Sequence, residues 1–315
     1  MTRVVVANEY GGPEVLAIVD ETVGEPGPGE VLLDIRAAGV NPADLKAYGG
    51  EFGRHPERLP LHVGSEASGV VRAVGADAIG ADGPVRVGDE VIAYRIQGGY
   101  AEQAVVPAAS IVPRPSTLTW EQAGGLMLTG VTAAHTLIAT AVGEGDKVLV
   151  HGAAGGVGTM AVQLTIVAGA RVIGTASPAS HEALRALGAE PVAYGDGLAD
   201  RVRALAPEGI DAAIDTVGTD EALDVSLELV ADRSRIATIA NFGRGPAAGV
   251  KVLGGGPGAD PGIEIRLGAR LDLARLAERG VLTVVVDRVF PLDRVVAAHE
   301  YLRGGHAHGK VILIP

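Results

Sequence analysis

The chain contains no cysteine among its 315 residues and only three methionines. Without cysteine, it can form no disulfide bond and no zinc or iron–sulfur centre held by thiolates. Its eight histidines are scattered, and none stands at a spacing to a second histidine or carboxylate that would build a metal site. His306-Ala307-His308 near the end fits a polar loop better than a metal site. We therefore expect this protein to hold no metal ion.

Clusters of basic residues are missing as well. Lysine and arginine together number 26 against 38 aspartates and glutamates, which gives a net charge of −12. This balance argues against nucleic acid or an anionic membrane as a partner and favours a small metabolite or cofactor. No apolar run approaches the roughly 20 residues of a membrane span, and the first residues turn polar too early for a signal peptide. We expect a cytoplasmic protein that binds no membrane.

The two halves of the chain follow different patterns. Up to about residue 115, short β-like runs alternate with glycine, proline and aspartate, which predicts a mostly-β region. From about residue 146, buried strands alternate with helix-like segments. The expected strands of this second region are 148–150, 171–175, 191–194, 210–214, 235–239 and 250–253. Six strands in that rhythm predict a doubly wound parallel α/β sheet that binds its ligand at the carboxyl ends of the strands.

A chain of this length favours two domains. Residues 112–116 read as a linker, and Thr119 with Gln122 three positions later predicts a capped helix start. After the glycines at 254–258, the expected elements are a helix at 272–279, a strand at 282–286, a helix at 292–302 and a strand at 311–314. We expect this tail to pack against the N-terminal half. The predicted domains are therefore 1–120 with 264–315, and an inserted cofactor domain at 121–263.

A glycine-rich motif follows the first strand of the second half. The residues Gly-Ala-Ala-Gly-Gly-Val-Gly occupy 152–158 and follow the apolar strand predicted at 148–150. An amphipathic helix begins directly after them, with apolar residues at 157, 160, 161, 164 and 168. Glycines let the backbone approach a pyrophosphate, and the positive end of the helix favours the anion. The motif predicts a dinucleotide site, although a glycine-rich turn is also common in a chain with 46 glycines.

The end of the second predicted strand bears on the choice of cofactor. Folds that bind NAD place a carboxylate there for the ribose 2′-hydroxyl, but here the nearest one is Glu182. Ser177, Ser180 and His181 can donate to a 2′-phosphate, which favours NADPH. An arginine would bind such a phosphate more strongly, but the only arginines near in sequence are 171 and 185. The alternative is that the two serines cap the helix beginning near His181, and both roles can coexist.

A second polar stretch lies in the first half. Residues 40–48 bring Asn41, Asp44, Lys46 and Tyr48 together beside a strand end. Taken alone, Asp44 and Lys46 are typical of a solvated surface pair, and Asn-Pro at 41–42 is an ordinary turn signal.

Several blocks in a fixed order are similar to the zinc-free quinone oxidoreductase or zeta-crystallin-like branch of the medium-chain dehydrogenase/reductase superfamily. They are NEYGGPEVL at 8–16, AAGVNPAD at 37–44, VGDEV at 87–91, GYAE at 99–102, LTGVTA at 128–133, the glycine motif, DTVG at 215–218 and GKV at 309–311. The resemblance implies a GroES-like, mostly-β catalytic domain, a Rossmann NADP-binding domain, a cleft between them, and a homodimer formed through the edge of the cofactor domain.

The zinc alcohol dehydrogenases of this superfamily carry cysteine in the first of these blocks and histidine in a Gly-His-Glu block. This chain has Asn41 at the first position and Ser65 at the second. With no cysteine for a structural zinc either, the sequence argues against zinc-dependent alcohol oxidation.

The resemblance also assigns residues to the cofactor. Beside the nicotinamide it places Asn41 and Thr129. Around the pyrophosphate it places Gly152, Ala154, Gly155, Gly156 and Val157. Around the 2′-phosphate it places Ser177, His181 and Tyr194, and on the strand-end loops Val217, Asn241 and Phe242.

Two positions depart from the family pattern. A tyrosine often stands five residues after the asparagine, where this chain has Lys46, with Tyr48 two positions later. The basic residue usual near the second strand end is also missing, which leaves the pH-sensitive His181 in its place.

Together these features predict an NADPH-dependent enzyme that transfers hydride to a quinone or another conjugated carbonyl. Asn41, Lys46 and Tyr48 are the expected catalytic residues, with Lys46 and Tyr48 as donors near the carbonyl oxygen. Reduction of an enone or an enoyl thioester is a close alternative. A non-catalytic NADPH-binding protein of the crystallin type is the alternative from another class.

Overall fold

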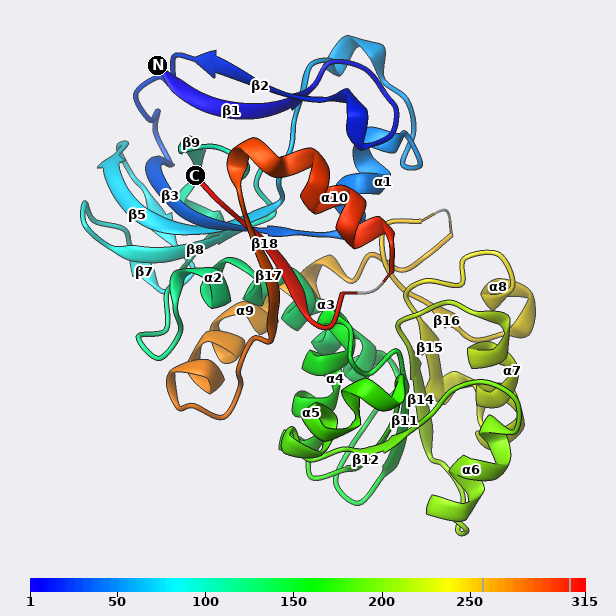
Figure 1. The fold of residues 1–315 in the computed structure, drawn as a ribbon. Coiled ribbons are helices and arrows are strands. Elements are labelled where there is room, and N and C mark those ends of the chain that lie inside the picture. Colours follow the sequence, from blue (N-terminus) through cyan, green and yellow to red (C-terminus); the bar gives the residue numbers. More distant parts are fainter. Residues whose placement is uncertain (257, 306) are drawn as a thin grey trace. The chain divides into compact units, whose positions relative to one another are not determined.

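The computed structural model describes residues 1–256, 258–305 and 307–315, which form two compact units (Figure 1). Unit 1 comprises Met1–Leu128 with Arg270–Pro315, and unit 2 comprises Thr129–Ala269. The boundaries predicted from the sequence, at 120/121 and 263/264, compare with 128/129 and 269/270 for the units, and the assignment of independent domains stays a prediction. Pro257, within the glycine-rich segment 254–258, and His306, within the predicted polar loop at 306–308, lie outside the described residues.

Unit 1 is built mainly from β-strands. Its largest sheet has the order β10-β8-β5-β3-β18-β17, with β9 also paired to β3, and a smaller sheet has the order β2-β1-β4. The strands are β1 Thr2–Ala7, β2 Leu16–Glu21, β3 Glu30–Val40, β4 Leu61–His62, β5 Glu66–Val74, β6 Ile79–Gly80, β7 Gly83–Pro84, β8 Glu90–Tyr94, β9 Gln103–Pro107, β10 Ile111–Pro113, β17 Val286–Pro291 and β18 Lys310–Ile314. The helices are α1 Pro42–Gly49, α2 Trp120–Gly124 and α10 Val295–Arg303.

The C-terminal tail completes the sheet of unit 1. Strand β18 pairs antiparallel with β3, with Val311 opposite Val40, and parallel with β17. The expected return of the tail to the N-terminal half is therefore confirmed. Buried side chains from both segments, including Leu33, Ile35, Val311 and Leu313, share one hydrophobic core.

Two details of the predicted elements were wrong. The segment 112–116 is no linker, because β10 pairs with β8 over Ile111–Pro113. The expected strand at 282–286 begins only at Val286, since the carbonyl of Val284 is taken by the side chain of Gln122 rather than by a neighbouring strand. The expected helix at 272–279 is confirmed, and it belongs to a longer helix, α9, which begins earlier and spans Ile263–Glu278.

Unit 2 contains the predicted parallel sheet. All five strand pairs are parallel, in the order β13-β12-β11-β14-β15-β16, so the six-stranded Rossmann-type sheet is confirmed. Central strands such as β14 are buried along their whole length, as expected where helices cover both faces. Helices α4 and α5 lie on one side of this sheet and α6 to α8 on the other (Figure 1).

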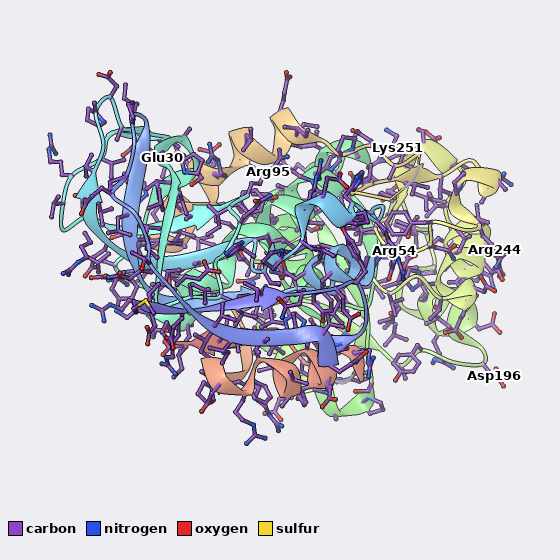
Figure 2. All side chains as sticks on the ribbon, turned by 90° about the horizontal axis from the view of Figure 1, so that it is seen from above. Glu30, Arg54, Arg95, Asp196, Arg244 and Lys251 are labelled. Atoms are coloured by element: carbon purple, nitrogen blue, oxygen red, sulfur yellow. The ribbon has the colours of Figure 1, made fainter. Side chains whose placement is uncertain are left out.

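The strands of unit 2 are β11 Lys147–His151, β12 Arg171–Thr175, β13 Glu190–Val192, β14 Ala212–Asp215, β15 Ile236–Thr238 and β16 Lys251–Val252. The helices are α4 Gly156–Val167, α5 His181–Ala186, α6 Leu198–Leu205, α7 Asp220–Leu229 and α8 Gly245–Ala248. Helix α3, Leu126–Ala139, carries the chain from unit 1 into unit 2, and α9 carries it back. Charged side chains such as Asp196 and Arg244 project from the surface of unit 2 (Figure 2). Over the described residues, no helix combines the length and apolar character needed to span a membrane.

Candidate active site

The glycine motif forms a tight turn between β11 and α4. Gly152 has a φ of +70°, a conformation that residues with a side chain rarely adopt, and Gly155 is the N-terminal cap of α4. A Cβ on Gly158 would lie 2.1 Å from the carbonyl oxygen of Gly152, so only glycine lets the helix start this close to the turn. Because the first helical bond runs from Thr159 N to Gly155 O, the N–H groups of 156–158 have no acceptor inside the helix. This turn fits a pyrophosphate.

His151 precedes this turn but serves the fold. Its side chain is buried, and its Nε2 lies 3.1 Å from Ser226 Oγ. Burial lowers the pKa of His151 to about 4, although the nearby Asp215 carboxylate acts in the opposite direction. The imidazole is therefore neutral near pH 7 and supplies no charge for a phosphate.

Asp215 and Thr238 organise the neighbouring strand-end loops, a role that the sequence reasoning missed. The Asp215 carboxylate accepts from the N–H groups of Val217 and Gly218 and from Thr238 Oγ1, at 2.9, 2.8 and 2.7 Å. Thr238 Oγ1 in turn accepts from the N–H of Asn241 at 2.9 Å. One buried carboxylate thus fixes both loops that carry predicted cofactor contacts.

The residues expected around a 2′-phosphate come from two strand ends of unit 2. Ser177 is half-buried, and Tyr194 is 59% exposed. Neither Ser177 nor Ser180 makes a capping hydrogen bond, so the capping interpretation is wrong. His181 Nε2 lies 3.3 Å from the carbonyl oxygen of Ala176, which requires a proton on that nitrogen. A neutral His181 then has only Nδ1 left, as an acceptor, and can donate to a phosphate only as imidazolium.

Arg171 is unavailable to such a phosphate. Its guanidinium forms a pair with Glu190 and lies 3.6 Å from Glu208, at the start of β12 rather than at its end. The pairing with Glu190 raises the pKa of Arg171 and lowers that of Glu190.

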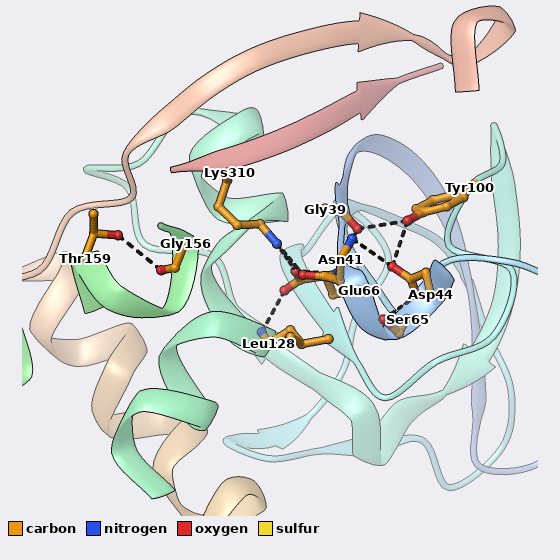
Figure 3. A network of polar contacts seen from close by, with 10 residues as sticks. All are labelled: Gly39, Asn41, Asp44, Ser65, Glu66, Tyr100, Leu128, Gly156, Thr159 and Lys310. Atoms are coloured by element: carbon orange, nitrogen blue, oxygen red, sulfur yellow. Dashed lines mark hydrogen bonds and ion pairs between the residues drawn. The ribbon is translucent and has the colours of Figure 1, made fainter. Parts of the chain in front are cut away.

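In unit 1, Asn41 belongs to a buried polar network (Figure 3). Its Nδ2 donates to Gly39 O at 3.0 Å and to Glu66 Oε1 at 3.1 Å, and its Oδ1 accepts from Lys310 Nζ. Lys310 Nζ also lies 2.9 Å from Glu66 Oε1, with 3% and 0% of the two side chains exposed. Glu66 Oε2 accepts from Leu128 N at 2.8 Å. Lys310 belongs to the sequence block at 309–311 and Glu66 directly follows Ser65, but no role was predicted for either.

Asp44 is part of the same buried region. It accepts from Tyr100 OH at 2.8 Å, from Ser65 Oγ at 2.9 Å and from the backbone N–H of Asn41 at 3.0 Å (Figure 3). Burial raises the pKa of Asp44, while the hydrogen bonds from Tyr100 and Ser65 act in the opposite direction. The interpretation of Asp44 as one half of a solvated pair is therefore wrong.

The two predicted donors differ in their surroundings. Lys46 is half-buried on α1. Tyr48 is 1% exposed, and its hydroxyl lies 2.8 Å from His299 Nδ1 in the core of unit 1. Burial raises the pKa of Tyr48, and the Asp44 charge adds to the effect.

The other predicted cofactor residues belong to unit 2. Thr129 is buried in α3, Val217 is 49% exposed, and Phe242 is half-buried. A Cβ on Gly256 would lie 2.5 Å from the Phe242 ring, so glycine allows this close packing. Asn241 is buried, and its Oδ1 accepts from Arg244 N at 3.0 Å.

The positions of the zinc ligands in related alcohol dehydrogenases are engaged in other contacts. Asn41 Oδ1 is bonded to an ammonium group, and Ser65 Oγ donates to Asp44. A divalent cation beside Asn41 would meet the charge of Lys310 at close range. Within the described ranges, no group of three or more histidines or carboxylates is placed to hold a metal ion. A zinc ion does not fit these residues.

Comparison with known proteins identifies the relatives of this chain. Residues 27–116 match the family of alcohol dehydrogenase GroES-like domains, and residues 187–313 match a family described as zinc-binding dehydrogenase. A quinone oxidoreductase of Pseudomonas aeruginosa is 34% identical, over 97% of each chain. The human synaptic vesicle membrane protein VAT-1 homolog is 30% identical over 100% of this chain and 87% of its own length.

Two solved structures are also similar over almost the whole chain. A mycobacterial protein complexed with NADPH has a TM-score of 0.86 at 32% identity and covers 100% of both chains. An NAD-dependent alcohol dehydrogenase has a TM-score of 0.86 at 31% identity and covers 99% of both chains.

Proposed function

The chain belongs to the quinone oxidoreductase and VAT-1 branch of the medium-chain dehydrogenase/reductase superfamily and is an oxidoreductase of this type, and we propose that it transfers hydride from NADPH to a quinone or another conjugated carbonyl without zinc. The observation that carries this proposal is the contact of Lys310 with Asn41, at the place of a zinc ligand in the alcohol dehydrogenases. Without a Lewis acid, the acceptor has to be electrophilic through its own conjugation. A quinone or an enone meets this requirement, and a simple ketone or aldehyde does not.

NADPH, when bound, supplies the hydride from its nicotinamide ring. In the proposed site the turn at Gly152, Ala154, Gly155, Gly156 and Val157 binds the pyrophosphate. Ser177, His181 and Tyr194 bind the 2′-phosphate. Asn41 and Thr129 bind the nicotinamide half, and Val217, Asn241 and Phe242 line the strand-end loops.

The chain's own contribution to the chemistry is then orientation and hydrogen bonding. Orientation of two reactants can supply about 7–11 kcal/mol when the reacting atoms are well aligned. Lys46 is the proposed donor toward the oxygen that gains charge. The buried hydroxyl of Tyr48 is bonded to His299, which favours a positioning role for Tyr48 and leaves Lys46 or water as the proton source.

The test is the acceptor-dependent oxidation of NADPH, followed by its absorbance with a panel of quinones, enones and enoyl thioesters. Oxidation with at least one quinone or enone is expected. Tight binding of NADPH without turnover on any acceptor would instead support the non-catalytic alternative.

Cofactor choice is tested separately by the dissociation constants of NADPH and NADH. The absence of a carboxylate at the end of β12 supports a preference for NADPH, as does the similar mycobacterial structure that contains it. Equal affinities, or tighter binding of NADH, would contradict the assignment of Ser177, His181 and Tyr194.

We also propose two cytoplasmic domains per chain, 1–120 with 264–315 and 121–263, and a homodimer formed through the edge of the cofactor domain. Sedimentation of the purified protein tests the dimer, and a monomer at micromolar concentration would contradict it.

A further inference from the structure

We infer that Glu66 and Lys310 are positioning residues that hold Asn41 as a hydrogen-bond acceptor for an N–H or O–H donor on the nicotinamide half of the cofactor. This inference rests on the proposed function for the identity of the cofactor. It concerns which atom Asn41 presents and which residues fix that choice.

The orientation of the Asn41 amide follows from its neighbours. An ammonium group has only donors, so the Asn41 atom that faces Lys310 Nζ has to be the oxygen. The nitrogen then faces Glu66 Oε1 at 3.1 Å and Gly39 O at 3.0 Å, both of which are acceptors. If the amide were flipped, its nitrogen would face the ammonium group of Lys310 and its oxygen would face two acceptors. None of the three hydrogen bonds could then form.

The same contacts determine what Asn41 can offer to a ligand. Both of its N–H groups are used, and one lone pair of Oδ1 is used by Lys310. The second lone pair of Oδ1 lies toward the backbone N–H of Asp44 in the capping box of α1 but makes no hydrogen bond to it, so this lone pair is the capacity that remains. Asn41 can therefore accept from a ribose hydroxyl or from the carboxamide NH₂ of the nicotinamide half. It cannot donate to the carbonyl oxygen of the substrate.

Glu66 connects this amide to the start of α3. One carboxylate oxygen accepts from Asn41 and Lys310, and the other accepts from the N–H of Leu128 in the first turn of that helix (Figure 3). Thr129, the other proposed contact of the nicotinamide half, is the next residue in the chain. A single buried carboxylate thus fixes Asn41 and the helical turn that carries Thr129.

Two glycines leave the space that the side chains of Glu66 and Lys310 occupy. A Cβ on Gly39 would lie 2.4 Å from Glu66 Oε1 and 2.7 Å from the carbonyl oxygen of Gly124. A Cβ on Gly125 would lie 3.0 Å from Lys310 Cε. Residues with side chains at these positions would displace the carboxylate or the lysine stem.

The variant that tests the inference replaces both charges, Glu66→Gln with Lys310→Met. Removing Lys310 alone would leave a buried carboxylate without its cation, and such single changes often prevent folding. The amide introduced at position 66 can still accept from Leu128 N, but no cation remains to hold the oxygen of Asn41. Unfolding in urea, followed by the fluorescence of Trp120 in unit 1, verifies that the double variant is folded.

Binding is measured with two ligands, NADPH and 2′-phosphoadenosine 5′-diphosphate, which lacks both the nicotinamide and the ribose attached to it. We expect the double variant to bind NADPH about tenfold more weakly, the equivalent of one hydrogen bond. Its affinity for the fragment should stay within about twofold of wild type, because the fragment lacks the group that Asn41 contacts. Asn41→Ala should give the same profile, and the triple variant should lose no further affinity, since all three residues act through one contact.

The matched control removes an ion pair of the same unit that lies outside the site, Arg3→Met with Glu102→Gln. Arg3 Nε and Glu102 Oε1 are 2.8 Å apart and partly exposed. This control should leave the affinity for both ligands unchanged.

Three outcomes would overturn the inference. An equal loss of affinity for NADPH and for the fragment would show a general structural role. Additive losses in the triple variant would show that the pair does not act through Asn41, and unchanged binding of NADPH would show that it has no role. Wild-type protein that binds NADPH but reduces no acceptor would contradict the proposed reaction while leaving the inference intact. Wild-type protein that does not bind NADPH would contradict both.

Discussion

Replacing His299 by asparagine should make the stability of unit 1 less sensitive to acid. His299 is fully buried on α10, its Nδ1 lies 2.8 Å from Tyr48 OH, and its Nε2 has no hydrogen-bond partner among the described residues. Burial lowers the pKa of His299 to about 3, from an ordinary value of about 6.5. The folded protein therefore excludes a proton that the unfolded chain takes up.

The sign and size of the effect follow from this shift in pKa. Because the unfolded state binds more protons below pH 6.5, the contribution of His299 is fully present above pH 6.5 and is lost as pH falls toward 3. Between pH 8 and pH 5.5, RT ln(1 + 10) gives a loss of about 1.4 kcal/mol in the free energy of unfolding. The lower pH stays above the isoelectric point of about 5.1, where the protein would tend to precipitate.

The assay is urea-induced unfolding at both pH values, followed by tryptophan fluorescence. The single tryptophan, Trp120, lies in α2 of unit 1 and so reports on the unit that contains His299. Between pH 8 and pH 5.5, the free energy of unfolding of wild type should fall by about 1.4 kcal/mol more than that of His299→Asn. This difference does not depend on how much stability the substitution itself removes at pH 8. The matched control is His55→Asn, which removes an exposed histidine of the same unit. An equal pH dependence in wild type and His299→Asn would refute the reasoning.

Three further predictions use other parts of the chain. Gly158→Ala should weaken NADPH binding at least tenfold and destabilise unit 2 by about 1–3 kcal/mol, because its Cβ would meet backbone atoms of Gly152 and Ala153; titration with NADPH and urea unfolding measure both. Gly268→Ala, in α9 with nothing within 4 Å of its Cβ, should leave binding unchanged and stabilise the helix by about 0.5–1 kcal/mol, and a destabilised Gly268→Ala would contradict the packing described there. Tyr48→Phe should keep kcat within about twofold and should cost about 1 kcal/mol of stability, because the contact with His299 is lost. Lys46→Ala should lower kcat about tenfold or more. Turnover that is unchanged in both variants would exclude both side chains as the donor.

The parts that could be predicted from the sequence are those with local signals. Strand β11, the turn at 152–158 and α4 are contiguous, so apolar pattern, glycine spacing and helical period all describe one short segment. The rhythm of the second half likewise predicted the parallel sheet, because its strands are buried runs separated by helices.

The polar network of unit 1 could not be predicted in the same way. Glu66 and Lys310 are separated by 244 residues, and only the pairing of β18 with β3 brings the lysine to the asparagine. A lone carboxylate at the start of an apolar strand, and a lone lysine before Val-Ile-Leu-Ile, are the signals that could have suggested a buried pair. Asp44 was misread for a similar reason, since its partner Tyr100 lies 56 residues away.

Hydride transfer itself is tested most directly with NADPH that carries deuterium on the transferred position of the nicotinamide. An enone that the acceptor panel identifies is reduced by protein dialysed against a chelator, and the product is analysed by mass spectrometry and NMR. We expect full activity after chelation and one deuterium on the β-carbon of the product. Product without deuterium at that carbon, or activity that is lost with the chelator and restored by zinc, would contradict this expectation.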